Sequence, residues 1–245
     1  MSYMNSFYPE SRFGNFTDID GTIIFYTRVN ELLKKNFTVL DTGCGRGAYG
    51  DDDVSVRKNI RIVKEKVNKV IGIDVDEKGN DNPYIDEFRL LKTDIWPVDT
   101  DSVDLIICDS VLEHIKTPEM FFSEANRALK KDGYLCIRTP NKWNYISVIS
   151  EIIPDRLHSK YVEKAQNNNR TAEDVFPVFY KCNSITKIKK MLKNHNFDSV
   201  VYGYEAEPSY LSFSRIAYFF GVLHQKLAPS IFRPAIFAFG KKISE

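Results

Sequence analysis

The chain has 245 residues, enough for one α/β domain with a well-buried core, or for a domain plus a cap. Its 43% hydrophobic and 27% charged content is that of an ordinary soluble globular protein. The formal net charge is only +1, from 34 basic and 33 acidic residues, so we expect no nucleic acid among its partners.

Cysteine usage and the termini bound the class further. The four cysteines, at positions 44, 108, 136 and 182, are far apart and form no C-x-x-C pair, which favours a reducing compartment and argues against structural zinc. We expect no signal peptide, and no apolar run approaches the ~20 residues of a membrane span. These observations predict a cytoplasmic protein without a transmembrane segment.

The first regular element is expected after an extended lead-in over residues 1–20. Apolar residues near helical spacing predict a helix over Thr22–Lys35. Tyr26 and Arg28 on this helix could reach back to a ligand, although a solvent-facing arginine is the more common case.

Residues 39–47, Val-Leu-Asp-Thr-Gly-Cys-Gly-Arg-Gly, predict a strand that stops abruptly at a tight turn. Glycine stands at every second position, as Gly43, Gly45 and Gly47. Glycine tolerates positive φ, and its missing side chain leaves room for a ligand against the backbone. The free N–H groups of a following helix would suit a carboxylate or phosphate there. A glycine-rich turn without a ligand is the alternative.

Two classes of ligand use such a loop. Gly43, Gly45 and Ala48 satisfy the G-x-G-x-x-A pattern of dinucleotide-binding folds. Asp41, two residues before the first glycine, favours a different ligand, because an acid aimed into the cradle would repel a pyrophosphate. S-adenosylmethionine carries a positive sulfonium and a positive α-ammonium, and both suit an acid at this position.

The second predicted strand also ends in an acid. Three aspartates at positions 51–53 indicate the start of a helix over Val54–Lys66, and a short buried strand follows over Lys69–Asp74. We expect the Asp74 carboxylate to accept hydrogen bonds from both hydroxyls of a ribose, with Val75 beside it. Asp76 is the competing acid for this role.

Polar residues follow the next two strands as well. A third strand over Phe88–Lys92 leads to Asp94 and Ile95, which are placed to take an adenine amino group and to flank its ring. A fourth, fully buried strand over Ser102–Cys108 has Asp109 and Ser110 at its carboxyl end. In open α/β sheets, ligands bind at that edge.

A helix then leads to the fifth strand. Thr117 is expected to cap this helix, with Pro118 in its first turn and Gly133 as the residue that ends it. The fifth strand is expected over Tyr134–Thr139, and Pro140 stops it.

In order and approximate spacing, these motifs resemble those of class I S-adenosylmethionine-dependent methyltransferases. The motifs are D-x-G-x-G-x-G from Asp41, the strand-end Asp74, Thr93-Asp94-Ile95, Ser102-Val-Asp-Leu, Val111-Leu-Glu-His and Arg127-Ala-Leu-Lys-Lys-Asp-Gly. The resemblance covers about residues 37–140 and is closest to members that act on quinones, small molecules or sugars. A later piece, over residues 174–197, is similar to methyltransferases associated with bacterial surface polysaccharide.

The resemblance implies an α/β, Rossmann-like doubly wound sheet of about seven strands, mostly parallel with an antiparallel last strand. It implies S-adenosylmethionine as cofactor and a small-molecule or glycan acceptor. The expected cofactor-binding residues are Asp41, Gly43, Cys44, Gly45, Gly47, Asp74, Val75, Asp94, Ile95, Asp109 and Ser110.

Residues 141–182 break the β-α rhythm of the chain. Their aromatic content argues against disorder, and so long a connection is usually functional. We interpret them as an insertion after strand five that caps the open edge of the sheet and shapes the acceptor pocket. A helix over Ser184–Asn194, a sixth strand over Phe197–Tyr204 and a final strand over 234–240 complete one methyltransferase domain over 1–245, with its core at about 22–140 and 183–245.

A broad apolar stripe precedes the last strand. It consists of Phe213, Ile216, Phe220, Leu223 and Leu227, with further apolar residues nearby. Packing on the core is the ordinary interpretation. Dimerisation through 212–228 or peripheral contact with a membrane surface are the alternatives.

The implied chemistry is an in-line SN2 transfer of a methyl group, with oxygen as the expected acceptor atom. The protein mainly supplies positioning and a desolvated pocket, but a hydroxyl acceptor also needs a base. His114 and His158 are the candidates, although His114 could simply orient its turn and His158 could lie on the surface. Glu113 beside His114 has no supporting ligand set, so we assign no metal.

Three hypotheses therefore stand at this point. The first is a methyltransferase acting on oxygen of a sugar or another small polar molecule. The second is a nicotinamide-dependent dehydrogenase that uses the G-x-G-x-x-A match. The third is a binding or scaffold protein that holds S-adenosylmethionine without turnover.

Overall fold

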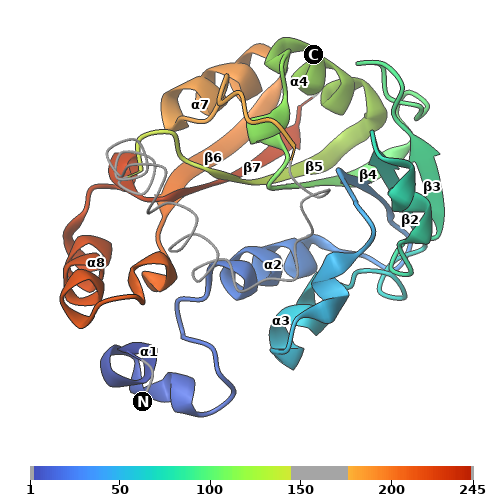
Figure 1. Cartoon of the computed structure of the whole chain (residues 1–245). Coiled ribbons are helices and arrows are strands. Elements are labelled where there is room, and N and C mark those ends of the chain that lie inside the picture. Colours follow the sequence, from blue (N-terminus) through green and yellow to red (C-terminus); the bar gives the residue numbers. More distant parts are fainter. Residues whose placement is uncertain (1–2, 145–175, 244–245) are drawn as a thin grey trace.

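A computed structural model describes residues 3–144 and 176–243 of the chain (Figure 1). Within these residues a seven-stranded sheet has the order β3-β2-β1-β4-β5-β7-β6. All neighbouring strands are parallel except β7, which runs antiparallel to both β5 and β6. The predicted mostly parallel sheet with an antiparallel last strand is confirmed. The strands are β1 (Thr38–Thr42), β2 (Lys69–Asp74), β3 (Glu87–Leu90), β4 (Val103–Asp109), β5 (Leu129–Pro140), β6 (Phe197–Tyr204) and β7 (Ala235–Lys242).

Helices cover both faces of the sheet (Figure 1). One face is covered by α2 (Gly21–Leu32) and α3 (Ser55–Arg61), and the other by α4 (Pro118–Ala128) and α7 (Ile185–Asn194). A short α1 (Tyr3–Phe7) lies beside α8 (Arg215–Leu227) at one side of the molecule. Short 3-10 turns are η1 (Pro9–Arg12), η2 (Ala48–Asp51), η3 (Glu77–Asp81), η4 (Leu112–His114), η6 (Ser209–Leu211) and η7 (Ser230–Phe232).

The central strand β4 shows why the sheet is buried on both faces. Leu105 and Ile107 belong to the core cluster that contains Phe25 of α2, whereas Ile106 belongs to the cluster that contains Phe122 of α4. Successive side chains of a strand point to opposite faces, so a continuous apolar run can only be satisfied between two helical layers. Cys108 and the other three cysteines are free and buried.

The parallel strands bring their following residues to one edge. The loop after β1, Asp74 of β2, Asp109 of β4 and the turn after β5 all lie at the carboxyl end of their strands. Because β6 is antiparallel to β7 and β7 to β5, β6 also ends at this edge, with Tyr204 opposite Ala235. The glycine loop and the segment that carries α8 thus leave the same side of the sheet.

Three local predictions were wrong. The lead-in is not wholly extended, because α1 and η1 form within it. The predicted helix Val54–Lys66 is shorter, as α3 ends at Arg61. Gly133 does not end a helix: α4 stops at Ala128, and the chain passes directly into β5, with Gly133 inside the strand. Leu129 is fully buried and Lys130 pairs with Asp104 of β4. These contacts favour the strand over a continued helix at these residues.

The apolar stripe on α8 was expected to pack on the core, and this interpretation was also wrong. Ile216 and Leu227 are each 71% exposed, and Phe220 is 60% exposed. The helix packs instead through its opposite face, where Tyr218 and Val222 meet Tyr8 and α1. Among the helices of the described residues, none is long and apolar enough to cross a bilayer.

Candidate functional site

The loop after β1 folds as the glycine spacing predicts. Gly43, Gly45 and Gly47 all have positive φ, at +64°, +48° and +78°. The amides of Gly43 and Cys44 donate to the Ile73 carbonyl of β2, which fixes the start of the loop. A Cβ placed on Gly45 would meet nothing within 4 Å, so this peptide faces open space. The loop therefore presents bare backbone where a ligand can approach it.

Asp74 lies at the end of β2, next to this loop. One of its carboxylate oxygens accepts a hydrogen bond from the Gly45 amide at 2.8 Å, and the other accepts one from the Asp76 amide at 2.9 Å. The side chain is 8% exposed. Asp76 instead caps η3 by accepting from the Lys78 amide. Of the two acids, Asp74 is the one that contacts the glycine loop.

Asp109, at the end of β4, is buried in a paired arrangement. Arg138 of β5 donates to both of its oxygens, at 2.6 and 2.7 Å, and the Tyr26 hydroxyl donates at 3.0 Å. Burial alone would raise the pKa of Asp109, but Arg138, Arg61 and these hydrogen bonds hold it below its ordinary value. The charge of Asp109 is thus neutralised by the protein itself.

Asp41 of β1 has the opposite surroundings. Within the described residues its carboxylate accepts no hydrogen bond, although Arg61 lies near enough to act on its charge. Desolvation, together with the negative charges of Asp109 and Asp74, raises the pKa of Asp41 to about 7. A cation that approaches Asp41 would therefore stabilise the ionised form of its carboxyl group.

Tyr26, which the sequence suggested could reach a ligand, lies at this edge together with two residues that the sequence did not single out, Tyr49 and Arg61. The Arg61 guanidinium lies over the Tyr49 ring at 4.6 Å and over the Tyr26 ring at 5.6 Å. One of its nitrogens is 3.6 Å from Asp109, and its buried Nε has no hydrogen-bond partner in the described part of the chain. Arg28, in contrast, is exposed. No spacing rule singles out Arg61, because its neighbours come from α2, η2 and β4.

The remaining predicted cofactor residues lie around this edge with side chains in solvent. Val75 is 60% exposed and Ile95 is 63% exposed. Asp94 accepts a hydrogen bond from the Thr117 hydroxyl at 2.9 Å. Thr117 precedes α4 as predicted, but its side chain makes no capping hydrogen bond to the helix. Ser110 has a positive φ of 59°, and its amide donates to the Arg138 carbonyl at 2.8 Å.

His114, a candidate base, lies in η4, and a hydrogen bond from its ring to the backbone of Pro177 fixes its orientation. Its Nδ1 lies 2.9 Å from the Pro177 carbonyl oxygen, and its Nε2 lies 4.0 Å from Glu113. A carbonyl can only accept, so this contact assigns the proton to Nδ1 and leaves the Nε2 lone pair available in the neutral ring. His158, the other candidate, lies outside the described residues.

Glu113 has a structural place. Its carboxylate accepts from the Thr139 hydroxyl at 2.9 Å, and its backbone carbonyl accepts from the Phe179 amide at 2.7 Å. The fully buried Asn183 donates to Thr139 as well. Burial raises the pKa of Glu113. These contacts fasten the described end of the 141–182 segment to the sheet. In the described residues, no group of three or more His, Cys, Asp or Glu side chains could hold a metal ion.

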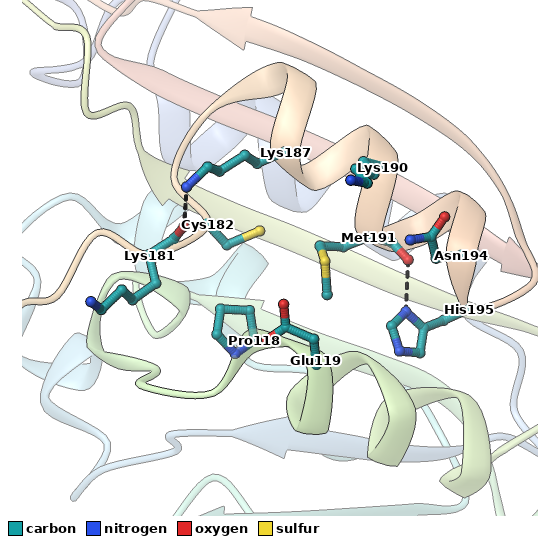
Figure 2. Close-up of a pocket in the computed structure, with 9 residues that line it drawn as sticks. All are labelled: Pro118, Glu119, Lys181, Cys182, Lys187, Lys190, Met191, Asn194 and His195. Carbon is teal, nitrogen blue, oxygen red and sulfur yellow. Dashed lines mark hydrogen bonds between the residues drawn. The ribbon is translucent and has the colours of Figure 1, made fainter.

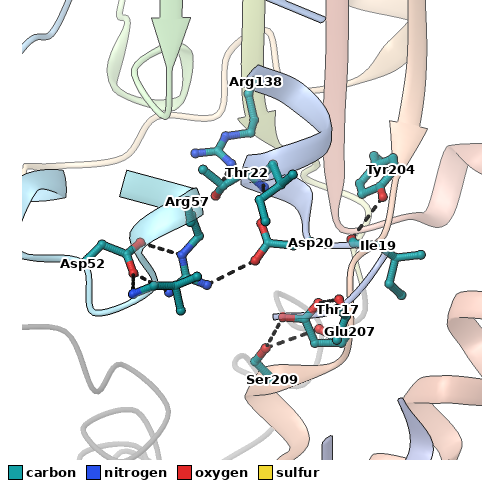
Figure 3. Close-up of polar contacts among 12 residues, drawn as sticks. Thr17, Ile19, Asp20, Thr22, Asp52, Arg57, Arg138, Tyr204, Glu207 and Ser209 are labelled. Atoms are coloured by element: carbon teal, nitrogen blue, oxygen red, sulfur yellow. Dashed lines mark hydrogen bonds and ion pairs between the residues drawn. The ribbon is translucent and has the colours of Figure 1, made fainter. Parts of the chain in front are cut away.

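A second network fixes the lead-in beside the same edge (Figure 3). Asp20 accepts from the Thr22 and Ile23 amides at the start of α2 and pairs with Arg57 of α3 at 3.1 Å. Arg138 also donates to the Thr22 hydroxyl at 2.7 Å. Through these contacts α2, α3 and β5 hold Tyr26 and Arg61 in position.

A pocket on the other side of the sheet lies between α4 and α7 (Figure 2). It is lined by Pro118, Cys182, Met191 and basic side chains that include Lys187 and Lys190. None of the predicted cofactor residues lines it. The carboxyl edge at the glycine loop therefore remains the candidate site.

Comparison with known sequences places these features in a family context. A family profile described as a methyltransferase domain matches residues 23–201. A probable S-adenosylmethionine-dependent methyltransferase of Mycolicibacterium smegmatis is 31% identical over 109 residues, which are 42% of this chain and 38% of that protein. One of Mycobacterium tuberculosis is 28% identical over 109 residues, 42% of this chain and 36% of that protein. The match thus spans well under half the length of these relatives.

Solved structures share the fold at low identity. A SAM-dependent methyltransferase from Archaeoglobus fulgidus has a TM-score of 0.55 and 19% identity, covering 95% of this chain and 97% of that one. The geranyl diphosphate C-methyltransferase of Streptomyces coelicolor has a TM-score of 0.52 and 13% identity, with coverages of 90% and 78%. The cyclase SpnF has a TM-score of 0.54 and 13% identity, with coverages of 91% and 81%. Because one of these proteins is described as a cyclase, the fold alone does not set the reaction.

Proposed function

The chain belongs to the methyltransferase domain family, and we propose that it transfers a methyl group from S-adenosylmethionine to oxygen of a small-molecule or sugar acceptor. The observation that carries this proposal is the Asp41 carboxyl, which accepts no hydrogen bond from the described residues, in the strand that leads into the open glycine loop. A dinucleotide would place a pyrophosphate against that acid. A sulfonium and an ammonium group would instead compensate a negative charge that the fold leaves unpaired.

The residues of the edge fit the parts of this cofactor. Asp41 would face its positive methionine end, and the orphaned Nε of Arg61 is a donor suited to the carboxylate of that end. Asp74 would take the ribose hydroxyls, with Val75 next to it, and Asp94 and Ile95 would take the adenine. Gly43, Cys44, Gly45, Gly47, Asp109 and Ser110 would complete the binding surface. When bound, the cofactor supplies a methyl group already activated by positive sulfur, so the protein's task is positioning.

His114 is our proposed base. With Nδ1 donating to the Pro177 carbonyl, Nε2 can accept the proton of an acceptor hydroxyl. His158 stays as the second candidate. We also propose that residues 141–182 shape the acceptor pocket within a single domain, and that the protein is cytoplasmic, in keeping with its four free cysteines.

Calorimetric titration followed by methyl transfer tests the proposal. We expect S-adenosylmethionine to bind and NAD not to bind, and labelled methyl groups to enter an acceptor in fractionated cell extract. Binding of NAD instead would favour the dehydrogenase and contradict the proposal. Binding of the methyl donor without transfer to any fraction would favour a scaffold protein.

The base assignment has its own test. His114→Asn should lower the rate of methyl transfer by roughly 10²–10⁴-fold without weakening cofactor binding, because a general base acts only on the acceptor. His195→Asn is the matched control, since His195 Nδ1 also bonds a backbone carbonyl, that of Met191 at 2.8 Å. If His158→Asn alone lowers the rate, the assignment moves to His158.

A further inference from the structure

The outer face of α8 is apolar but uncovered. Its exposed residues are Ile216, Phe219, Phe220, Leu223 and Leu227, each between 42% and 71% exposed, and we call them the α8 patch. Just beyond the helix, Ile231 and Phe232 of η7 are 46% and 49% exposed. Monomeric proteins rarely leave large apolar side chains gathered in this way unless something binds them.

The α8 patch is a separate apolar face of the helix and not an exposed margin of its packed face. Tyr218, Gly221 and Val222 form the packed face of α8 against α1 and η6. At 100° per residue, Ile216, Leu223 and Leu227 fall on the side directly opposite. Figure 1 shows α8 at the side of the molecule, next to α1 and away from α4 and α7. One face of α8 is therefore packed within the protein, and the opposite face is exposed and could bind another surface.

The charges beside the patch indicate the chemistry of that surface. From Pro208 to Ile243 the sequence contains five Lys or Arg residues and no Asp or Glu, in a chain whose basic and acidic residues otherwise nearly balance. Lys241 and Lys242 pair with Asp132 and Asp101. Arg215 and Lys226 are exposed on one flank of the patch, and neither has an acidic partner among the described residues.

We propose that the α8 patch binds the surface of an anionic lipid bilayer, with α8 lying in the interface. Apolar side chains flanked by unpaired cations are the pattern of interfacial helices, whose basic residues are attracted to anionic headgroups. The 13 residues of α8 are too few to span the ~20-residue hydrocarbon core, so the helix lies on the membrane.

A second copy of this chain fits the patch less well. In a two-fold interface each copy presents the same surface, so the basic flank of one α8 would meet the acid-free segment of the other. Like charges would then face each other without a compensating acid. An anionic membrane complements both the apolar and the basic parts of the surface.

The position of α8 gives this binding a consequence. The segment that carries α8 leaves the sheet at the edge where the glycine loop lies. A bilayer held there would bring acceptors carried in its surface to the same side as the cofactor site. This consequence rests on the proposed methyl transfer, whereas the membrane binding itself does not.

Vesicle flotation of the full chain tests the proposal. We expect binding to phosphatidylcholine vesicles that contain phosphatidylglycerol and much weaker binding to phosphatidylcholine alone. The triple variant Ile216→Ser/Phe220→Ser/Leu227→Ser should bind at least about tenfold more weakly, because it removes apolar area that enters the interface. Arg215→Gln/Lys226→Gln should lower binding by about fivefold for each charge removed.

Two matched controls isolate the patch. Val56→Ser/Val200→Ser removes exposed apolar side chains from α3 and β6, and Lys189→Gln/Lys193→Gln removes two exposed charges from α7. Both should bind vesicles like the wild type. Equal losses in the controls would mean unspecific attraction and overturn the proposal.

Other occupants of the patch give different results. If the wild type ignores anionic vesicles and sediments as a dimer that the triple variant dissociates, a second copy covers the patch and the proposal fails. A second outcome is that the wild type is a monomer that does not bind vesicles, and that the triple variant unfolds at a lower temperature. In that case residues 145–175 of the same chain would cover the α8 patch, and the proposal would also fail. Calorimetry with S-adenosylmethionine on each variant tests the proposed function separately, since these substitutions lie outside the cofactor residues.

Discussion

Strands β1 and β4 lie side by side, and each carries an aspartate toward its carboxyl end, yet the surroundings of the two carboxylates are opposite. Asp109 of β4 receives two hydrogen bonds from Arg138 and one from Tyr26. Asp41 of β1 receives none from the described residues, and its pKa is raised to about 7. Two residues of identical chemistry on neighbouring strands therefore differ only in what the fold provides around them.

This difference separates structural from functional charge. A buried carboxylate that the protein neutralises contributes to holding elements together, here β4, β5 and α2. A carboxylate left without a partner costs stability unless a ligand supplies the missing charge. Sites that bind ligands are commonly destabilised in this way. We therefore expect opposite effects on stability at the two positions: loss of the partner of Asp109 should destabilise the protein, whereas loss of the Asp41 charge should stabilise it.

The largest expected effect is at Arg138. Arg138→Met should destabilise the protein by about 3–5 kcal/mol, because it leaves the Asp109 carboxylate buried without its main cation. Urea denaturation measures the change. The double variant Arg138→Met/Asp109→Asn should recover much of the loss, since no buried charge then remains. A single variant within about 1 kcal/mol of the wild type would mean that Asp109 does not depend on Arg138.

Asp41 should show the opposite sign. Its folded-state pKa of about 7 lies above the ordinary value of 3.8, so the folded protein binds more protons than the unfolded chain between these values, and stability falls as pH rises through this window. Asp41→Asn should therefore stabilise the unliganded protein above pH 7 by about 1–3 kcal/mol, and not below pH 4. The exposed Asp53→Asn is the matched control, and equal effects of the two substitutions would refute the argument.

Asp74 should matter for the adenosyl part of the ligand. Asp74→Ala should weaken binding of S-adenosylmethionine by roughly 1–3 kcal/mol, because a ribose would lose its charged acceptor and the Gly45 amide would lose its partner. Asp76→Ala, which removes the cap of η3 instead, should weaken binding less. If titration shows the reverse order, Asp76 holds the ribose.

Local sequence pattern predicted much of the edge, for a physical reason. Apolar runs that end in an acid or a glycine mark where a buried strand reaches the surface. For this reason β2 was placed at its observed bounds, and the loop after β1 has the positive φ values that its glycines suggest. Parallel pairing then brings these ends together without further information.

Partners that meet across the fold could not be predicted in this way. Arg138 is 29 residues from Asp109 along the chain, and Tyr26 is 83 residues from it. Arg61 lay in a predicted helix, but nothing local indicated that it would reach Tyr49. The stripe on α8 failed for the same reason, because periodicity shows that a helix has an apolar face but not whether another element covers it.

We propose that the fold leaves the Asp41 carboxylate unpaired so that it can hold a positively charged methyl donor. This proposal can be tested by calorimetric titration of S-adenosylmethionine into the wild type and into Asp41→Asn, from below pH 7 to above it. We expect wild-type affinity to fall by up to about tenfold per unit as pH drops below the Asp41 pKa of about 7, because the carboxyl must lose its proton to bind. The variant should bind more weakly, and its affinity should not depend on pH in this range. Equal affinity with the same pH dependence in both proteins would contradict the proposal.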